Sequence, residues 1–194
     1  MSPAFSVAVY CGSRPGRDPA FEAVAHEVGT WIGRHGGQLV YGGGKSGLMG
    51  AVAHSTRAAG GRVVGVIPQS MVVREWANHD CDELHVVNTM HERKQMMADR
   101  ADAFLALPGG IGTFEEFFEV WAWRQLGFHE RPVGLLNTAG YYQPLVDFMG
   151  ASVKAGFMSE VQMDLIRIGD AAAPLLQALV QAAGMAPAAR TQLI

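Results

Sequence analysis

Short apolar runs alternate with longer stretches of helical periodicity along nearly the whole chain. Apolar runs of this length, several rich in Val and Ile, are typical of strands buried in a sheet. They predict strands at Phe5–Tyr10, Gln38–Tyr41, Arg62–Ile67, Leu84–Val87, Ala103–Leu107, Pro132–Leu136 and Leu165–Ile168. The stretches between them predict helices near 19–35, 47–60, 90–101, 114–126, 141–155 and 171–183.

This regular alternation of strands and helices indicates an α/β protein with a parallel sheet covered on both faces. Because crossovers between parallel strands are right-handed, we expect a Rossmann-like doubly wound sheet in a three-layer α/β/α sandwich. Ligands of such folds lie outside the carboxyl ends of the strands. Four predicted strands end in loops of glycine and polar residues, at 11–16, 42–47, 88–89 and 108–110, and we expect these loops on one rim.

Composition narrows the class of protein. A chain of 194 residues with 49% hydrophobic and 17% charged residues suits one compact domain, which we place at 1–184, with 185–194 as a flexible tail. The net charge of −3 gives no reason to expect nucleic acid or an anionic membrane as a partner. Two cysteines, no signal-peptide pattern and no apolar run long enough to span a bilayer predict a cytoplasmic protein.

The segment 108–116, Pro-Gly-Gly-Ile-Gly-Thr-Phe-Glu-Glu, carries the strongest chemical signal. Its three glycines stand between a predicted strand and a predicted helix, where backbone N–H groups can approach an anion closely. Thr113 and Glu116 have the spacing of a capping box, which would place Glu116 in the first helical turn. The helix dipole would then lower the pKa of Glu116 and keep it charged, as suits stabilisation of a cationic sugar transition state.

A second capping box, Thr89 to Glu92, predicts a helix start that places Arg93 in the first turns. A cation near a helix N-terminus is unfavourable and requires a compensating anion. A substrate phosphate or a carboxylate would serve, and a surface arginine paired with a nearby acid is the simpler alternative.

The glycines at 42, 44 and 47 match a dinucleotide fingerprint in spacing, but the next predicted strand ends without the acidic residue that binds ribose. A P-loop is also disfavoured, because Leu39 occupies the position of its first glycine. An anion-binding loop at a helix N-terminus remains for the triplet at 42–44. For Gly47 and Gly50, close packing of helix against sheet is an equally good explanation.

Two further clusters have structural interpretations. Four aromatic residues at helical spacing, Phe114, Phe117, Phe118 and Trp121, predict a core-facing stripe, whereas Trp123 falls on the opposite face and favours a subunit contact. The histidines, acids and cysteine at 79–85 fit no zinc-binding spacing, so we predict a polar loop and no metal.

Residues 90–94, Met-His-Glu-Arg-Lys, followed by the glycine motif at 108–116, resemble the LOG ("Lonely Guy") family. These are cytokinin riboside 5′-monophosphate phosphoribohydrolases, which are often labelled lysine decarboxylases. Segments in family order at 11–13, 41–44, 47–50, 65–68, 125–127 and 135–137 extend the resemblance over nearly the whole chain.

The resemblance implies hydrolysis of the N-glycosidic bond of an N6-modified adenosine monophosphate by a homodimer without metal or organic cofactor. It implies that Arg93 and Glu116 are the catalytic pair. Ala122 stands where the family usually has a substrate-contacting threonine. The positions that match substrate contacts are Glu75, Lys94, Gly110, Ile111, Gly112, Thr113, Phe114 and Glu115, with Gly109, Gly43 and Gly44 expected at the phosphate.

Three other functions are weighed against this one. Plain AMP nucleosidase activity is the nearest enzymatic alternative, and a non-catalytic nucleotide or cofactor carrier is the nearest binding protein. A pyridoxal-phosphate decarboxylase needs a Schiff-base lysine, and none of Lys45, Lys94 and Lys154 has a recognisable context for one.

Overall fold

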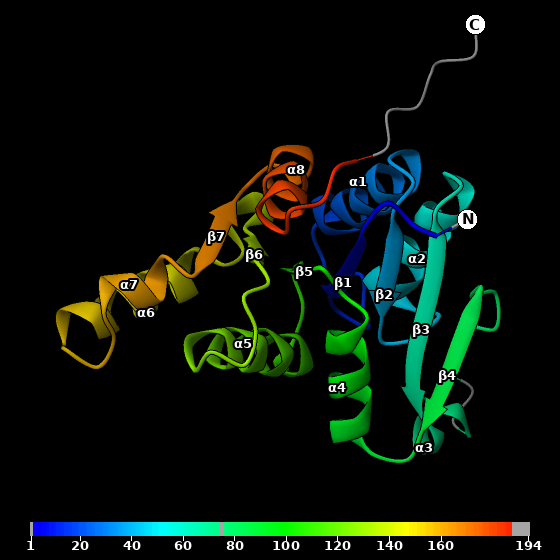
Figure 1. The fold of residues 1–194 in the computed structure, drawn as a ribbon, viewed down its shortest axis with the longest axis horizontal. Helices are drawn as coiled ribbons and strands as arrows, with labels where there is room; N and C mark the ends of the chain where they lie inside the picture. The colour runs from blue at the N-terminus through cyan, green and yellow to red at the C-terminus, as the bar shows by residue number, and fades with distance from the viewer. Residues whose placement is uncertain (1, 74–75, 188–194) are drawn as a thin grey trace, which may run out of the picture.

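The computed structural model of the chain describes residues 2–73 and 76–187 and contains a seven-stranded, all-parallel sheet in that part of the chain. The strand order is β4-β3-β2-β1-β5-β6-β7 (Figure 1). The predicted strands are all confirmed to within one residue at each end, as β1 (Ser6–Tyr10), β2 (Gln38–Tyr41), β3 (Arg62–Pro68), β4 (Glu83–Val87), β5 (Ala103–Ala106), β6 (Val133–Leu136) and β7 (Ile166–Gly169).

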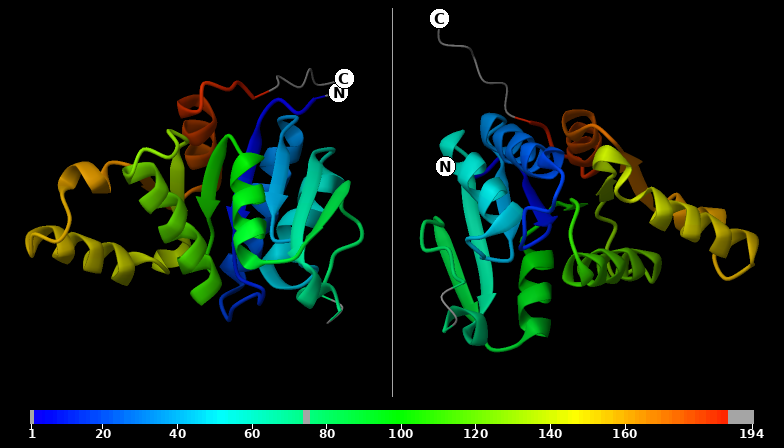
Figure 2. Two further views of the ribbon diagram at one scale, coloured as in Figure 1. Left: turned by 60° about the horizontal axis from the view of Figure 1, so that its bottom comes forward. Right: turned by 180° about the vertical axis from the view of Figure 1, so that it is seen from behind.

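Helices cover both faces of the sheet, so the predicted three-layer sandwich is confirmed. One face carries α1 (Pro19–Arg34), α2 (Gly47–Ala58) and α8 (Ala172–Ala182), and the other carries α4 (Met90–Asp99) and α5 (Ile111–Gln125) (Figures 1 and 2). Because alternate residues of a strand point to opposite faces, β1 sends Val7 and Val9 to one hydrophobic core and Ala8 and Tyr10 to the other. Helices α6 (Gln143–Lys154) and α7 (Glu160–Met163) extend beyond the edge of the sheet.

The differences from prediction lie in short or terminal elements. Two four-residue helices, α3 (Gln69–Val72) and α7, and a 3₁₀ turn over Thr138–Gly140 are too short for periodicity to reveal. Of the predicted tail, residues 188–194 lie outside the described residues, and Met185 packs against the core instead of extending away. No helix in the described ranges is long and apolar enough to cross a membrane.

The topology explains where a ligand can bind. The chain leaves the central strand β1, builds β2 to β4 on one side, and returns to place β5 on the other side of β1. At such a switch point the loops after the two neighbouring strands diverge and open a crevice at their carboxyl ends.

Candidate active site

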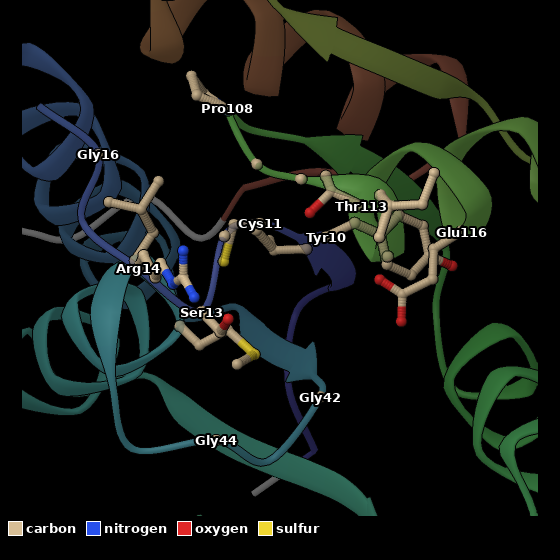
Figure 3. Close-up of a pocket in the computed structure, with 18 of the residues that line it drawn as sticks. Tyr10, Cys11, Ser13, Arg14, Gly16, Gly42, Gly44, Pro108, Thr113 and Glu116 are labelled. Atoms are coloured by element: carbon tan, nitrogen blue, oxygen red, sulfur yellow. The ribbon is translucent and has the colours of Figure 1, made fainter. Parts of the chain in front are cut away.

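A cavity of about 570 Å³ opens at this switch point (Figure 3). The loops after β1, β2 and β5 form its walls, together with the first turns of α4 and α5. Three of the four loops predicted to share a rim therefore line it, and the fourth, at 88–89, caps the helix that contributes Met90 and Arg93. Figure 3 shows Tyr10, Thr113 and Glu116 on one side of the cavity and Ser13 and Arg14 on the other.

Arg93 and Glu116 meet in the wall of this cavity. The Arg93 Nη1 group donates a hydrogen bond of 2.7 Å to Glu116 Oε1, and the two side chains are only 10% and 9% exposed. Arg93 Nε also donates to the carbonyl of Val66, at 3.1 Å. The anion that compensates Arg93 near the start of its helix is therefore a carboxylate, which was one of the two predicted possibilities.

Local structure makes room for this arginine. Thr89 caps α4 by accepting a hydrogen bond from the Glu92 N–H at 3.1 Å, as the capping box predicts. The Glu92 carboxylate accepts a hydrogen bond from the N–H of Asn88 at 2.8 Å, whereas a capping box predicts the N–H of Thr89. A Cβ on Gly42 would lie 1.9 Å from Arg93 Nη2, so the absence of a side chain there admits the guanidinium. The first glycine of the triplet thus serves Arg93 rather than an anion.

The capping box predicted at Thr113 is wrong. Helix α5 begins at Ile111 with Gly110 as its N-cap, so Thr113 is the third helical residue and Glu116 lies in the second turn. The Thr113 side chain is buried beside Gly109, where a Cβ would lie 2.1 Å from its hydroxyl oxygen. Tight packing between the loop and the threonine therefore replaces the cap that a local reading of the sequence suggests.

The predicted electrostatics of Glu116 are also wrong. Burial raises the pKa of Glu116 above the ordinary carboxyl value, and the Arg93 guanidinium lowers it by less than burial raises it. The helix dipole falls off within the first turn, which Glu116 does not occupy. A carboxyl group in this environment exchanges its proton at a higher pH than a solvated one does.

The N-terminus of α5 has the open backbone that a phosphate needs. Apart from their chain neighbours and the backbone of α5 itself, Gly110 and Gly112 have no heavy atom of the described residues within 4 Å of where a Cβ would stand. Both line the cavity, as do Gly109, Ile111 and Thr113. The first N–H groups of a helix have no partner within it and carry the positive end of its dipole. This turn of backbone can therefore bind an anion.

The remaining glycines around the loop after β2 divide between the cavity wall and close packing. Gly44 lines the cavity, whereas Gly43 lies against Ile67 and Leu84 with a φ of 72°. A Cβ on Gly47 would lie 2.4 Å from the backbone of Ser13, and one on Gly50 would lie 2.3 Å from the Lys45 carbonyl oxygen. Both glycines are therefore needed for close packing as predicted, but against the loops at Ser13 and Lys45 and not against the sheet.

Lys94 and Phe114, which the resemblance assigns to substrate, do not line the cavity. Lys94 is buried and forms ion pairs with Glu115 and, at 2.8 Å, with Glu119. Phe114 packs edge-on against Tyr142, with ring centroids 6.2 Å apart. Glu75 lies outside the described residues. Ala122 is exposed on α5 and is absent from the cavity lining.

The sequence-based site missed a group of larger side chains that complete the cavity. Arg14 lies in a loop that the sequence singles out, so its position was the easiest of the group to foresee. The others come from two strands, from helices and from loops, and several lie in segments that the resemblance includes without assigning them to substrate. The missed residues are Tyr10, Arg14, Phe21, Leu48, Met49, Ile67, Met71, Trp76, Met90 and Tyr141.

The aromatic stripe on α5 is confirmed only in part. Phe117 and Trp121 are buried, but Phe118 is exposed, so it does not belong to the core of this chain. Trp123, predicted to favour a subunit contact, is partly buried against the protein's own second core. Across residues 2–73 and 76–187, no group of three His, Cys, Asp or Glu side chains is placed to hold a metal ion.

Comparison with known proteins shows the family of the chain. The family model described as "Possible lysine decarboxylase" matches residues 49–179, more than half of the chain. A rice (Oryza sativa subsp. japonica) protein named "Probable cytokinin riboside 5'-monophosphate phosphoribohydrolase LOG4" is 44% identical over 181 residues, covering 93% of this chain and 79% of the rice protein. A Rhodococcoides fascians cytokinin riboside 5′-monophosphate phosphoribohydrolase is 48% identical over 155 residues, covering 79% of this chain and 78% of that protein.

Among solved structures, the Moco carrier protein of Chlamydomonas reinhardtii superposes with a TM-score of 0.69 over 95% of this chain and 99% of that one. At 23% sequence identity this likeness bears on the fold alone. The family model and the two enzymes of much higher identity point to the same group, and the chain therefore belongs to the LOG family.

Proposed function

We propose that this protein hydrolyses the N-glycosidic bond of N6-modified adenosine 5′-monophosphates and releases the free base, a cytokinin, and ribose 5-phosphate. The names of relatives at 44% and 48% identity support this activity. The observation that carries the proposal is the buried Arg93–Glu116 pair, set in the same cavity as the open N-terminus of α5. One part of the cavity suits a phosphate, and another offers a carboxylate to the sugar.

The phosphate would lie against the backbone of residues 109–113. The glycines there leave the N–H groups of the first turn of α5 accessible, and a phosphate accepts such hydrogen bonds without a dedicated cation. Because the phosphate is remote from the reacting bond, its binding would fix the position of the ribose and contribute binding energy to the reaction. Lys94 and Glu115 would support this arrangement from behind, because their ion pair joins α4 to α5.

Cleavage of the C1′–N9 bond leaves positive charge on the ribose and negative charge on the purine. The Glu116 carboxylate would stabilise the positive charge and accept a proton from the attacking water, whose oxygen bonds to C1′. The leaving base takes up a proton, so one water is consumed per bond broken. A raised pKa suits a carboxyl group that accepts and then returns a proton. Arg93 would hold Glu116 in position through the 2.7 Å hydrogen bond.

Lysine decarboxylation, which the family model's description suggests, does not fit the cavity. None of the described residues that line it is a lysine. Burial alone would lower the pKa of Lys94, but its hydrogen bonds to Glu115 and Glu119 raise it above the ordinary value. A Schiff-base lysine must be free to lose its proton, and Lys94 is held in the opposite state.

AMP nucleosidase activity and non-catalytic nucleotide binding are the competing functions. Each can be separated from the proposal by chromatography of the purified protein with AMP and with isopentenyladenosine monophosphate. The proposal expects release of free base, faster from the N6-modified nucleotide, and loss of release in Glu116→Gln. Equal or greater turnover of AMP would favour the nucleosidase, and binding without release from either nucleotide would favour a carrier.

We propose further that the enzyme is a cytoplasmic homodimer and needs no metal or organic cofactor. Exposed apolar side chains on and near α5 and α6, among them Phe118, Phe128, Phe148 and Phe157, support a contact with a second copy. Light scattering after size exclusion tests the dimer. An activity assay with and without a chelator tests the statement that no metal is needed. A monomer that is fully active, or activity abolished by the chelator, would contradict them.

A further inference from the structure

Three consecutive carbonyl groups at the exit of β5 each accept one hydrogen bond. Leu107 accepts from the Tyr142 hydroxyl at 2.7 Å, Pro108 from the Gly12 N–H at 3.1 Å, and Gly109 from the Tyr141 hydroxyl at 2.5 Å. Tyr142 is buried and does not line the cavity, whereas Tyr141 lines the cavity and is 38% exposed. The two tyrosines are neighbours in sequence, yet only one of them contacts the candidate phosphate loop.

The Gly109 carbonyl belongs to a peptide unit of this loop that has a glycine on each side. It joins Gly109 to Gly110, and a peptide flanked by two glycines has no Cβ to restrict it on either side. In a planar trans peptide the C=O of Gly109 and the N–H of Gly110 point in opposite directions. Rotation of this unit would replace an N–H group with a carbonyl oxygen at the N-cap of α5, where a phosphate would be repelled.

Tyr141 is itself held firmly. Its ring packs edge-on against Phe21 of α1, with centroids 5.4 Å apart, and against Tyr142 at 4.9 Å. The turn before it is unusual, because Ala139 has a φ of 52° and Gly140 a φ of 71°. A left-handed alanine costs free energy, and such strain is maintained where the surrounding structure requires the geometry. Here the turn delivers two adjacent tyrosine hydroxyls to carbonyls two residues apart.

We propose that Tyr141 is a positioning residue of the substrate site. Its hydroxyl fixes the Gly109–Gly110 peptide with the carbonyl turned to the tyrosine, so that the N–H groups of the α5 N-terminus are presented to an anionic group of the ligand. The identification of that group as the 5′-phosphate of a nucleotide rests on the proposed function.

The test is Tyr141→Phe, with Tyr142→Phe as the matched control. Each variant loses one hydroxyl and one hydrogen bond to a carbonyl of the same strand exit and keeps its ring. Calorimetric titration with ribose 5-phosphate measures the anion site directly, and steady-state kinetics with isopentenyladenosine monophosphate give KM and kcat separately.

We expect Tyr141→Phe to raise the Kd of ribose 5-phosphate and the KM of the nucleotide about fivefold to tenfold, as loss of one ordering hydrogen bond predicts. We expect kcat within about twofold, because the Arg93–Glu116 pair is untouched. Tyr142→Phe should leave both constants unchanged, even if it melts earlier. Unchanged binding in Tyr141→Phe, an equal loss in both variants, or no ribose 5-phosphate binding by the unaltered protein would overturn the proposal. Absence of turnover by every form would refute the proposed hydrolysis, while the titrations would still decide the role of Tyr141.

Discussion

Replacement of Glu116 by glutamine should separate the role of this side chain in stability from its role in chemistry. The amide keeps the size of the carboxylate and an oxygen that can accept the hydrogen bond from Arg93, now 2.7 Å long. Burial raises the pKa of Glu116 in spite of Arg93, so the folded protein favours the neutral form more than the unfolded chain does. A neutral isostere should therefore fit the folded state at least as well as the charged group.

We expect the free energy of unfolding of Glu116→Gln at pH 7 to stay within about 1 kcal/mol of the parent's value or to exceed it. Removing one partner of a net-stabilising buried pair costs about 3–5 kcal/mol instead. Activity should fall about 10²–10³-fold, since the variant loses the charge that stabilises the sugar cation. Glu119→Gln is the matched control, because Glu119 lies on the same helix and pairs with Lys94 outside the cavity.

Denaturant unfolding at pH 7 and chromatographic assay of base release measure the two effects. A destabilisation of 3 kcal/mol or more in Glu116→Gln would refute the view that burial of this carboxylate is only partly compensated. Activity close to that of Glu119→Gln would remove Glu116 from the chemistry.

Three other predictions follow from the same geometry. The midpoint of the acidic limb of kcat/KM should lie above pH 4.5, because activity needs the ionised form of Glu116 and burial raises the pKa of this group. By the same shift, protonation of Glu116 stabilises the fold below pH 4.5, and this stability is lost as the pH rises through the raised pKa. A midpoint at or below pH 4.5 in a pH–rate profile would contradict both statements. Gly112→Ala should melt no earlier than the parent, since its methyl meets no described residue outside the backbone of its own helix and alanine favours a helix over glycine. The same variant should raise KM about tenfold or more by occupying the phosphate space, and an unchanged KM would place the phosphate elsewhere. Ala139→Gly should stabilise the protein by about 0.5 kcal/mol, because relief of the left-handed alanine exceeds the cost of the added freedom of the unfolded chain. A loss of stability in calorimetric melting would show that the turn is unstrained.

The sheet and its rim could be predicted from the sequence because both depend on local patterns. Each strand is an apolar run between turn residues, and the right-handed crossover rule fixes the layers once the alternation is known. The meeting of Arg93 with Glu116 could be expected from the same source, because each follows a strand whose carboxyl end lies on that rim. Tyr141 could not, because its link to Gly109 spans 32 positions and depends on a strained turn.

The start of α5 shows how a local signal can be overruled by packing. Thr113 and Glu116 have the residue types and spacing of a capping box, and nothing nearby in the sequence contradicts it. In the fold, the space beside Gly109 accepts the threonine side chain, and the helix gains three residues. The consequence reaches the chemistry, because it moves Glu116 from the first turn to the second and leaves burial as the main influence on its pKa.

The neighbouring pairs Arg93–Lys94 and Glu115–Glu116 extend this argument to the roles that the family resemblance implies. Successive residues on a helix point about 100° apart, so two adjacent side chains on a helix tend to face different surroundings. The structure resolves the choice on both helices at once: Arg93 and Glu116 face the cavity, and Lys94 and Glu115 pair with each other away from it. The two ion pairs thus join α4 to α5 at adjacent positions. The Lys94–Glu115 pair, away from the cavity, holds the two helices at the spacing that the Arg93–Glu116 pair requires. A motif of four charged residues therefore divides into two that can touch a substrate and two that set the distance between the helices that carry them.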